Sequence, residues 1–539
     1  MTKRSGAQVL VESLAREGIE MVFGVPGNQN MPVFDALYHH PRVAHRVVRH
    51  EQTASFMADG YARASGRIAA VLSLPGPGVT FAYTGLAEAY TDSSPILLLA
   101  SQINREDINQ DKGILHELTG QQKILAPIMK FGERVTKVES IPGAVHRAVA
   151  ALRSGRPRPA QLEIPRDVQL ETVEWPDEPS VPPPAQQKRA CAPLEAVESA
   201  SSALLSAKRP MIYAGGGVIS SGASDVLVRL AERLGAPVLT SGMGVGSIPG
   251  DHALACGVSW IAAADVRPLV AAADLLLAVG TRFGEAMTHA WTLDLPPVTI
   301  QIDVDADEIG HSLPMQYALV GDARATLVAI EERVAAQGLD RGSQIAPGLA
   351  TARRAYRRAL ERRAGSSLPW ARALRHSLPR DTIISADMTC FWADVLGMFP
   401  VYQPRTVLFP WGYGTLGFGV PAALGAKVAM PDRPVISIVG DGGFLYTGME
   451  LATAMKYKLG VPILVFNDNA FAIIKKQQRD QYGGRFIAVD LHNPDFVQLA
   501  HAFGAHGERV TTPEMLGEAL GRALTVDIPT VIEIPWNWE

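Results

Sequence analysis

Short apolar runs, each followed by a helical pattern, recur along the whole chain, and this alternation limits the fold more than any other feature. Runs that are apolar at every position are typical of strands buried on both faces of a parallel sheet. Helices cover both faces of such sheets. The sequence therefore predicts an α/β protein made of doubly wound parallel sheets. The runs expected as strands lie at 20–27, 46–51, 68–78 and 95–101, at 209–218, 236–242, 274–283 and 298–304, and at 381–387, 434–443, 461–469 and 530–536.

Two seams divide these runs into three groups. The first seam, residues 171–193, is rich in proline and should hold neither a helix nor a strand for long. The second, residues 335–368, contains a basic helical pattern that we expect to face solvent. A chain of 539 residues is also too long for one hydrophobic core. We therefore expect three domains, at 1–170, 190–335 and 366–539.

Composition argues against several classes of protein. The formal net charge of −4 gives no electrostatic reason to bind nucleic acid or an anionic membrane. No apolar run is long enough to cross a membrane, and residues 1–20 have the pattern of an amphipathic helix rather than of a signal peptide. Cys191, Cys256 and Cys390 are too far apart in the sequence for a disulfide framework or a zinc motif. We expect a cytoplasmic protein whose partners are small molecules.

Polar clusters follow two neighbouring apolar runs in the last third of the chain. Gly-Asp-Gly with Asp441 follows one run, and Asn-Asp-Asn with Asp468 follows the next. The two carboxylates are separated by about the length of one strand, helix and strand unit. Because parallel strands joined in this way end at the same edge of a sheet, both carboxylates should arrive there together.

The residues around Asp441 suit a bound phosphate. Gly440, Gly442 and Gly443 allow a tight turn and close backbone approach, and the N–H groups of such a turn can bind an anion together with the helix that follows. A carboxylate repels phosphate, so Asp441 predicts a divalent cation between the two. Mg²⁺ is usually bound by few carboxylates together with phosphate oxygens. The predicted ligands are Asp441, Asp468 and the carbonyl group of Ala470.

This pairing resembles the motif of thiamine diphosphate-dependent enzymes, in which Gly-Asp-Gly is followed a little under thirty residues later by an Asn-Asn or related pair. The family usually has Asn where this chain has Asp468, and Asn467 is a lesser candidate ligand. The resemblance covers nearly the whole chain. It implies a pyrimidine-binding domain at 1–170, a middle domain at 190–335 and a diphosphate-binding domain at 366–539. It is nearest to the branch of acetolactate synthase, oxalyl-CoA decarboxylase and benzaldehyde lyase.

The resemblance assigns further residues to the cofactor. Glu51, which we expect to end a strand before a helix, would bond the aminopyrimidine ring and favour the imino tautomer that removes the thiazolium proton. Leu416 would lie under the cofactor and impose its bent shape. The Gly414 carbonyl and the Leu416 N–H would then bind the edge of the pyrimidine. Thr389 is also expected to bind the cofactor.

Assembly and a second cofactor follow from the same resemblance. Glu51 and Asp441 lie in different domains, which in this family meet across two subunits. The resemblance therefore implies a homodimer or homotetramer with sites at the subunit interface. FAD in the middle domain is possible but not favoured, because the glycine turn at 215–217 is a weak signal and the expected arginine pattern after 280–283 is missing.

Several residues depart from acetolactate synthases and predict a more polar pocket. His116 and Glu117 stand where those enzymes have Phe-Gln, and Gln477 stands where they have Trp. We take His116, Glu117 and Gln477 as candidate catalytic residues. His116 could carry protons near neutral pH or could be a surface histidine. Asn28 could line the pocket or could serve only the turn in which it lies.

The expected reaction is cleavage of a carbon–carbon bond next to a carbonyl, often in a 2-oxo acid, followed by transfer of the bound fragment to an acceptor. Simple decarboxylation of a 2-oxo acid is one alternative. Lysis of a 2-hydroxyketone or an acyl-CoA is another. A cofactor-binding subunit without catalytic activity is a third, and the presence of Glu51, Asp441 and Leu416 argues against it.

Overall fold

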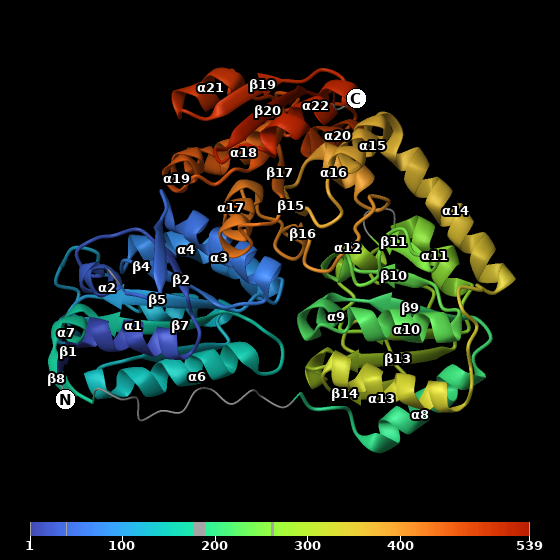
Figure 1. Ribbon diagram of the computed structural model, residues 1–539, viewed down its shortest axis with the longest axis horizontal. Coiled ribbons are helices and arrows are strands. Elements are labelled where there is room, and N and C mark those ends of the chain that lie inside the picture. Colours follow the sequence, from blue (N-terminus) through green and yellow to red (C-terminus); the bar gives the residue numbers. More distant parts are fainter. Residues whose placement is uncertain (1, 39, 177–188, 260–262, 538–539) are drawn as a thin grey trace.

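The computed structural model describes residues 2–38, 40–176, 189–259 and 263–537, and within them the chain forms three six-stranded sheets (Figure 1). Every pair of neighbouring strands in these sheets is parallel. This confirms the predicted α/β class with doubly wound sheets. We call them the N-terminal, middle and C-terminal sheets; Figure 1 shows them at the three corners of a triangular molecule.

The N-terminal sheet has the strand order β3-β2-β4-β5-β7-β6. Its strands are β2 (Met21–Gly24), β3 (Ala44–Val47), β4 (Ala69–Ser73), β5 (Ile96–Gln102), β6 (Phe131–Arg134) and β7 (Ala160–Pro165). The helices of this part are α1 (Gly6–Arg16), α2 (Met31–Leu37), α3 (Glu51–Ser65), α4 (Pro77–Thr91), α5 (Gln121–Leu125), α6 (Ile141–Arg153) and α7 (Arg166–Leu170).

A small antiparallel pair beside this sheet was not predicted. Strand β1 (Thr2–Ser5) pairs with β8 (Thr172–Trp175), so the chain start is not helical throughout and the first seam contains a strand. The helix expected at 1–20 begins only at Gly6, where Ser5 and Gln8 cap it reciprocally. Residues 177–188 of the seam lie outside the described residues.

The middle sheet has the order β11-β10-β9-β12-β13-β14. Its strands are β9 (Pro210–Ala214), β10 (Val238–Thr240), β11 (Ala255–Val258), β12 (Leu275–Val279), β13 (Val298–Asp303) and β14 (Tyr317–Val320). Its helices are α8 (Leu194–Ser206), α9 (Gly216–Ser221), α10 (Ser224–Leu234), α11 (Ala263–Ala271), α12 (Glu285–Thr288) and α13 (Ala323–Ala336). The basic helix predicted in the second seam is α14 (Pro347–Ala364), and most of its arginines are exposed.

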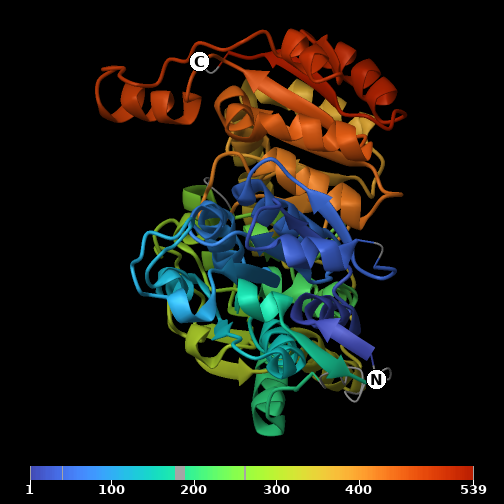
Figure 2. The same ribbon diagram turned by 90° about the vertical axis from the view of Figure 1, so that its left-hand side faces the viewer.

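The C-terminal sheet has the order β16-β15-β17-β18-β20-β19. Its strands are β15 (Ile383–Ala386), β16 (Val407–Leu408), β17 (Val435–Gly440), β18 (Pro462–Asn467), β19 (His506–Arg509) and β20 (Thr530–Pro535). Its helices are α15 (Leu368–Ser377), α16 (Cys390–Val395), α17 (Gly419–Ala429), α18 (Asp441–Thr447), α19 (Leu451–Tyr457), α20 (Ala472–Gln481), α21 (Phe496–Ala502) and α22 (Pro513–Ala523). Figure 2 shows α20 and the chain after it projecting from this part of the molecule.

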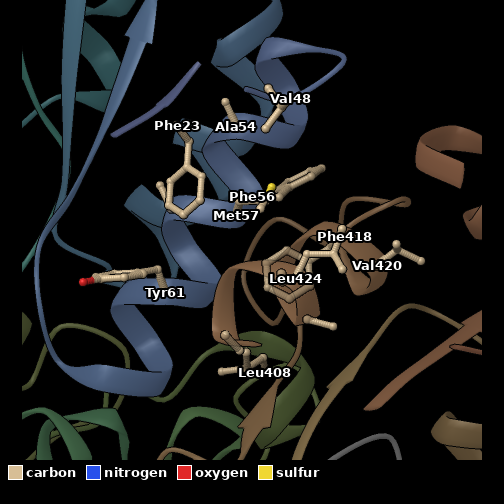
Figure 3. Close-up of a cluster of buried hydrophobic side chains, with 14 of the residues drawn as sticks. Phe23, Val48, Ala54, Phe56, Met57, Tyr61, Leu408, Phe418, Val420 and Leu424 are labelled. Carbon is tan, nitrogen blue, oxygen red and sulfur yellow. The ribbon is translucent and has the colours of Figure 1, made fainter. Parts of the chain in front are cut away.

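Helices α3 and α17 join the N-terminal and C-terminal parts through one shared core. The ring of Phe56 packs edge-on against that of Phe418, with 5.5 Å between the ring centroids (Figure 3). Two glycines allow the helices to cross in backbone contact: a Cβ at Gly60 would overlap the carbonyl of Ala422, and one at Gly425 would overlap the carbonyl of Met57. The N-terminal and C-terminal sheets are therefore fixed relative to each other.

Two expectations about chain type can be compared with the described residues. None of the helices formed by these residues is both long enough and apolar enough to span a membrane. Cys191, Cys256 and Cys390 are all free thiols.

Candidate active site

The carboxylates of Asp441 and Asp468 lie at the same edge of the C-terminal sheet, as the sequence predicted. Gly440 at the end of β17 is opposite Phe466 near the end of β18, so the chain leaves both strands side by side. Asp441 begins α18 and is almost fully buried, while Asp468 is half-buried. The carbonyl group of the buried Ala470 follows in the same loop.

The electrostatics of this pair favour a bound cation. Burial raises the pKa of Asp441. Burial, with the charge of Asp441 as the next cause, raises the pKa of Asp468 to about 7. A cation between them would relieve this repulsion, and an all-oxygen donor set suits Mg²⁺. Among the described residues no three His, Cys, Asp or Glu side chains gather as a metal site, so further ligands would come from backbone, phosphate or water.

Asn493 links the metal candidates and was missed by sequence reasoning. Its side-chain amide donates to Asp441 Oδ2 at 2.6 Å and to Asn467 Oδ1 at 2.9 Å. Asn467 in turn donates to Glu533 Oε1 at 2.9 Å. The side chain of Asn467, the lesser candidate ligand, is therefore engaged in hydrogen bonds with Asn493 and Glu533.

The glycine turn after β17 is packed closely by residues that follow β15. A Cβ at Gly443 would lie 2.7 Å from Asp387 Oδ2, and one at Gly440 would lie 3.6 Å from the Cβ of Thr389. Thr389 is buried at the start of α16, and its hydroxyl does not cap that helix. The predicted cofactor residues Gly440, Gly442, Gly443 and Thr389 thus line one corner of the sheet edge.

Asp387 is a second residue that sequence reasoning missed. Its Oδ2 accepts from the N–H of Gly417 at 2.7 Å, and burial raises the pKa of its carboxyl to about 6. It therefore fixes the end of the loop that carries Gly414 and Leu416. Gly414 has φ +73°, a conformation that favours glycine, and Leu416 is half-buried. Within the described chain the Gly414 carbonyl and the Leu416 N–H have no hydrogen-bond partner, which leaves them available to a ligand.

Glu51 lies at the start of a helix rather than at the end of a strand. Strand β3 ends at Val47, and Glu51 is the first residue of α3. Its side chain is 7% exposed, and Oε1 would lie 3.1 Å from a Cβ at Gly78, so it faces the glycine turn at residues 76–78, where α4 begins. Among the described residues no hydrogen bond or ion pair joins this carboxylate to Asp441, Asp468 or the loop around Leu416.

His116 lies against the same glycine turn. A Cβ at Gly76 would lie 2.7 Å from the carbonyl oxygen of His116. The His116 Nδ1 is 2.9 Å from Oε1 of the buried Gln29, whose amide nitrogen donates to the Leu115 carbonyl. Phe81, four residues into α4 from this turn, is half-exposed and packs on His50 with 4.6 Å between ring centroids.

Three other predicted site residues have local partners or face solvent. Glu117 accepts from the N–H groups of Asp111 and Ile114, so its carboxylate closes its own loop. Gln477 is exposed on α20 and bonds Gln481. Asn28 is also exposed, and Arg166 binds its carbonyl oxygen.

A separate cavity of about 1270 Å³ lies between the middle sheet and the other two parts. It extends over the ends of β9, β12 and β13. Arg156 at its wall pairs with Glu308, and burial raises the pKa of the neighbouring Asp303 to about 6. Among the residues predicted from sequence for the site, none lines this cavity.

Three family models match the chain in order. Residues 4–124 match "Thiamine pyrophosphate enzyme, N-terminal TPP binding domain", residues 197–330 match its "central domain", and residues 387–534 match its "C-terminal TPP binding domain". Thiamine pyrophosphate is another name for thiamine diphosphate.

Curated relatives are similar over almost the whole chain. A "Probable acetolactate synthase large subunit" of Methanocaldococcus jannaschii is 35% identical, over 98% of this chain and 91% of its own length. A "Probable 2-ketoarginine decarboxylase AruI" of Pseudomonas aeruginosa is 38% identical, over 95% of this chain and 90% of its own. The "Acetolactate synthase isozyme 3 large subunit" of Escherichia coli is 33% identical, over 97% of this chain and 93% of its own length.

Proposed function

The chain belongs to the thiamine diphosphate-dependent enzymes, in the acetolactate synthase branch, and on that premise we propose that Asp441, Asp468 and the Ala470 carbonyl bind Mg²⁺ against the cofactor's diphosphate. It is an enzyme, a carboligase or decarboxylase. The observation that carries the metal site is the pair of repelling carboxylates at the ends of neighbouring strands β17 and β18. Thr389 and the glycine turn at 440–443 would contact the diphosphate.

The remaining contacts with the cofactor follow from the unpaired groups of the site. The Gly414 carbonyl and the Leu416 N–H would bind the pyrimidine, and the side chain of Leu416 would support the bent cofactor. Glu51 would hold and move a proton at the pyrimidine ring nitrogen. When bound, the cofactor supplies the carbon nucleophile that attacks the substrate carbonyl, while the protein supplies position and charge.

We propose two copies per functional unit, because in the described part of one chain no hydrogen bond or ion pair joins Glu51 to Asp441. Exposed apolar side chains around the C-terminal site support this assembly: Tyr413, Leu445, Tyr446 and Met449. Others lie on α20 and on the chain that follows it, which project from the molecule (Figure 2): Ile473, Ile474, Tyr482, Phe486 and Ile487. A homodimer, alone or paired into a tetramer, would cover such surfaces.

The substrate we propose is a 2-oxo acid with a polar side chain. His116, paired with Gln29 beside the glycine turn that faces Glu51, would line the pocket from the N-terminal part, and Asn28 lies in the turn next to Gln29. From the partner copy, α20 would present Gln477 instead of an aromatic residue. Glu117 bonds the backbone of the loop that carries His116, so we propose that it acts indirectly, by holding His116 in position.

A second candidate is simple decarboxylation of a 2-oxo acid that ends in a guanidinium group. The name of the Pseudomonas aeruginosa relative specifies that chemistry, and its identity to this chain is 38%. The two candidates share the first step and differ in the fate of the bound fragment, which is released as an aldehyde or transferred to an acceptor.

The cavity beside the middle sheet supports a further proposal, a bound nucleotide. Its volume of about 1270 Å³ exceeds that of a typical small-molecule site, and arginines from all three parts line it. FAD, which the sequence did not favour, would be structural there because the proposed reaction is redox-neutral. Visible absorbance of the purified protein tests for a flavin. Three free thiols fit the reducing cytoplasm that we propose as its compartment.

Thermal melting of metal-stripped protein, with and without thiamine diphosphate and Mg²⁺, tests the cofactor site. A ligand at a hundred times its Kd stabilises the folded protein by about 2.7 kcal/mol. CO₂ release and product analysis with pyruvate and with a guanidinium-bearing 2-oxo acid then separate the candidate reactions. Glu51→Gln should melt like the wild type with cofactor and yet turn over no substrate; full activity in that variant would refute the mechanism.

A further inference from the structure

Glu88 of α4 binds the backbone of the loop that carries Gly414 and Leu416. Its Oε1 accepts from the N–H of Tyr413 at 3.4 Å. Its Oε2 accepts from the N–H of Thr415 at 3.2 Å and from the Thr415 hydroxyl at 2.9 Å. The two bound amides lie on either side of Gly414, and the second directly precedes Leu416.

Glu88 is the central member of a series of anchors along the loop 409–417. Carboxylates accept the N–H groups at four alternate positions, 411, 413, 415 and 417, and an arginine donates to the carbonyl at 409. The anchors on either side of Glu88 are Arg63 to Phe409, Asp92 to Trp411 and Asp387 to Gly417. Three of the four anchoring side chains come from α3, from α4 and from Asp92 at the C-cap of α4, so the N-terminal part of the chain sets the path of this loop.

Burying a carboxylate at this place costs free energy on folding. Glu88 is fully buried, and Asp59 and Asp92 are buried beside it with Arg63, which pairs with both aspartates at 3.3–3.4 Å. Burial raises the pKa of all three carboxyls. Buried acids of this kind are tolerated where donors satisfy them, and the loop supplies three donors to Glu88. A glutamine could not accept at both ends of its side chain, because one end is itself a donor.

We propose that Glu88 is a positioning residue for the cofactor, holding the Gly414 carbonyl and the Leu416 N–H and side chain at the pyrimidine. This inference rests on the proposed thiamine diphosphate site. Glu88 itself would not contact the cofactor; it acts through the backbone at 413 and 415. Its loss should therefore impair activation of the bound cofactor more than binding, because the diphosphate and metal contacts remain.

The test measures exchange of the proton on the reactive thiazolium carbon with D₂O, in enzyme loaded with thiamine diphosphate and Mg²⁺ and without substrate. Glu88→Gln should slow this exchange by about 10- to 100-fold, the effect of a small misplacement at a reacting group. The Kd for the cofactor should change by less than about threefold. Thr415→Val, which removes only the hydroxyl donor, should slow exchange by about two- to tenfold.

Controls separate positioning from general damage. Glu17→Gln removes another buried carboxylate, at the end of α1 where it pairs with His146 and Arg153, and should exchange at the wild-type rate. The double variant Glu88→Gln with Thr415→Val should be little slower than Glu88→Gln alone, because both act through one contact. Additive losses would count against the inference.

Failure of this inference can be told from failure of the proposed function. If the wild type takes up no thiamine diphosphate, or if Glu51→Gln exchanges as fast as the wild type, the proposed function is wrong. If those results hold and loaded Glu88→Gln exchanges normally, only the positioning role is wrong. Should Glu88→Gln fail to fold, Thr415→Val decides alone, and normal exchange in that variant overturns the proposal.

Discussion

At the scale of single residues, Asp441 and Asp468 should not be equivalent. Asp441 is almost fully buried and bonded by Asn493, whereas Asp468 is half-buried and repelled by Asp441. Asp468→Asn keeps a carbonyl oxygen and removes the repulsion, so its Mg²⁺ affinity should fall by less than about tenfold. Asp441→Asn should abolish Mg²⁺-dependent stabilisation by thiamine diphosphate, because both Asp441 oxygens accept hydrogen bonds, from Asn493 and from Gly442, and an amide can accept at only one end. Calorimetric titration of the metal measures both, and equal losses would contradict the assignment.

Asn493 should matter for the metal although it is not a ligand. Its amide orients Asp441 Oδ2 at 2.6 Å. Residues that orient metal ligands typically contribute 10- to 100-fold in affinity, so Asn493→Ala should weaken Mg²⁺ binding by about that factor. The same titration checks it. Unchanged affinity would mean that Asp441 is held adequately by the N–H of Gly442.

The sequence predicted the site best where chemistry is local. Gly-Asp-Gly and Asn-Asp-Asn can each be recognised from a few consecutive residues, and the structure places them at the ends of neighbouring strands. Asn493, Asp387 and Glu88 gave no such signal. Asn493 is 52 residues from Asp441, and Glu88 is 327 residues from Thr415, so only the folded chain reveals these contacts.

At the scale of helices and strands, the crossing of α3 and α17 depends on glycine. Gly425→Ala would push a methyl group into the Met57 carbonyl, and overpacking of this kind usually costs about 1–3 kcal/mol of unfolding free energy, or more where backbone must move. Gly521→Ala in the exposed part of α22 meets no atom within 4 Å and should stabilise by up to about 1 kcal/mol. Urea denaturation of both variants provides the comparison. A neutral Gly425→Ala would show that the helices can separate.

Strand prediction succeeded in the centre of the sheets and failed mainly at their edges. The unpredicted strands of the three large sheets are β6, β7, β11, β14, β16 and β19. All except β7 are edge strands, and β7 lies next to the edge. Central strands are covered on both faces and must be apolar throughout, whereas an edge strand such as β19, with the sequence HGER, can be polar. The periodic signal is weakest where burial is least.

At the scale of the whole molecule, shared sites can be tested by mixing inactive variants. If each site takes Glu51 from one copy and Asp441 from the other, Glu51→Gln and Asp441→Ala are inactive alone. A mixed dimer would have one intact site of its two. After unfolding and refolding an equimolar mixture, about a quarter of wild-type activity should return. No recovery, with dimers verified by sedimentation, would mean that each chain builds its own site.

The pH dependence of stability should carry a contribution from Asp303 at the cavity. Burial raises its pKa to about 6, above the value of about 3.9 in an unfolded chain. Between these values the folded protein holds a proton that the unfolded chain has lost, so stability falls as pH rises through this window. Between pH 4 and about 6, the unfolding free energy of the wild type should fall by at most about 3 kcal/mol relative to that of Asp303→Asn. Above about pH 6 the difference should not grow further.

Asp225 should show the opposite sign in the same measurement. Its hydrogen bonds with Arg324 hold its pKa at about 2. The unfolding free energy of the wild type should therefore rise relative to that of Asp225→Asn as pH rises towards about 4. Chemical denaturation of the three proteins at several pH values checks both slopes. Parallel pH curves for Asp303→Asn and the wild type would contradict the assignment at Asp303.

The shared core of α3 and α17 also sets a schedule for biosynthesis. Helix α3 ends at Ser65 and α17 begins at Gly419, so a ribosome must add roughly 350 residues between them. At about 5–20 residues per second, the apolar face around Phe56 waits about 20 to 70 s for its partner. During that interval the first part of the nascent chain exposes an apolar surface that is prone to aggregation. A chaperone that covers this surface would raise the yield of folded enzyme.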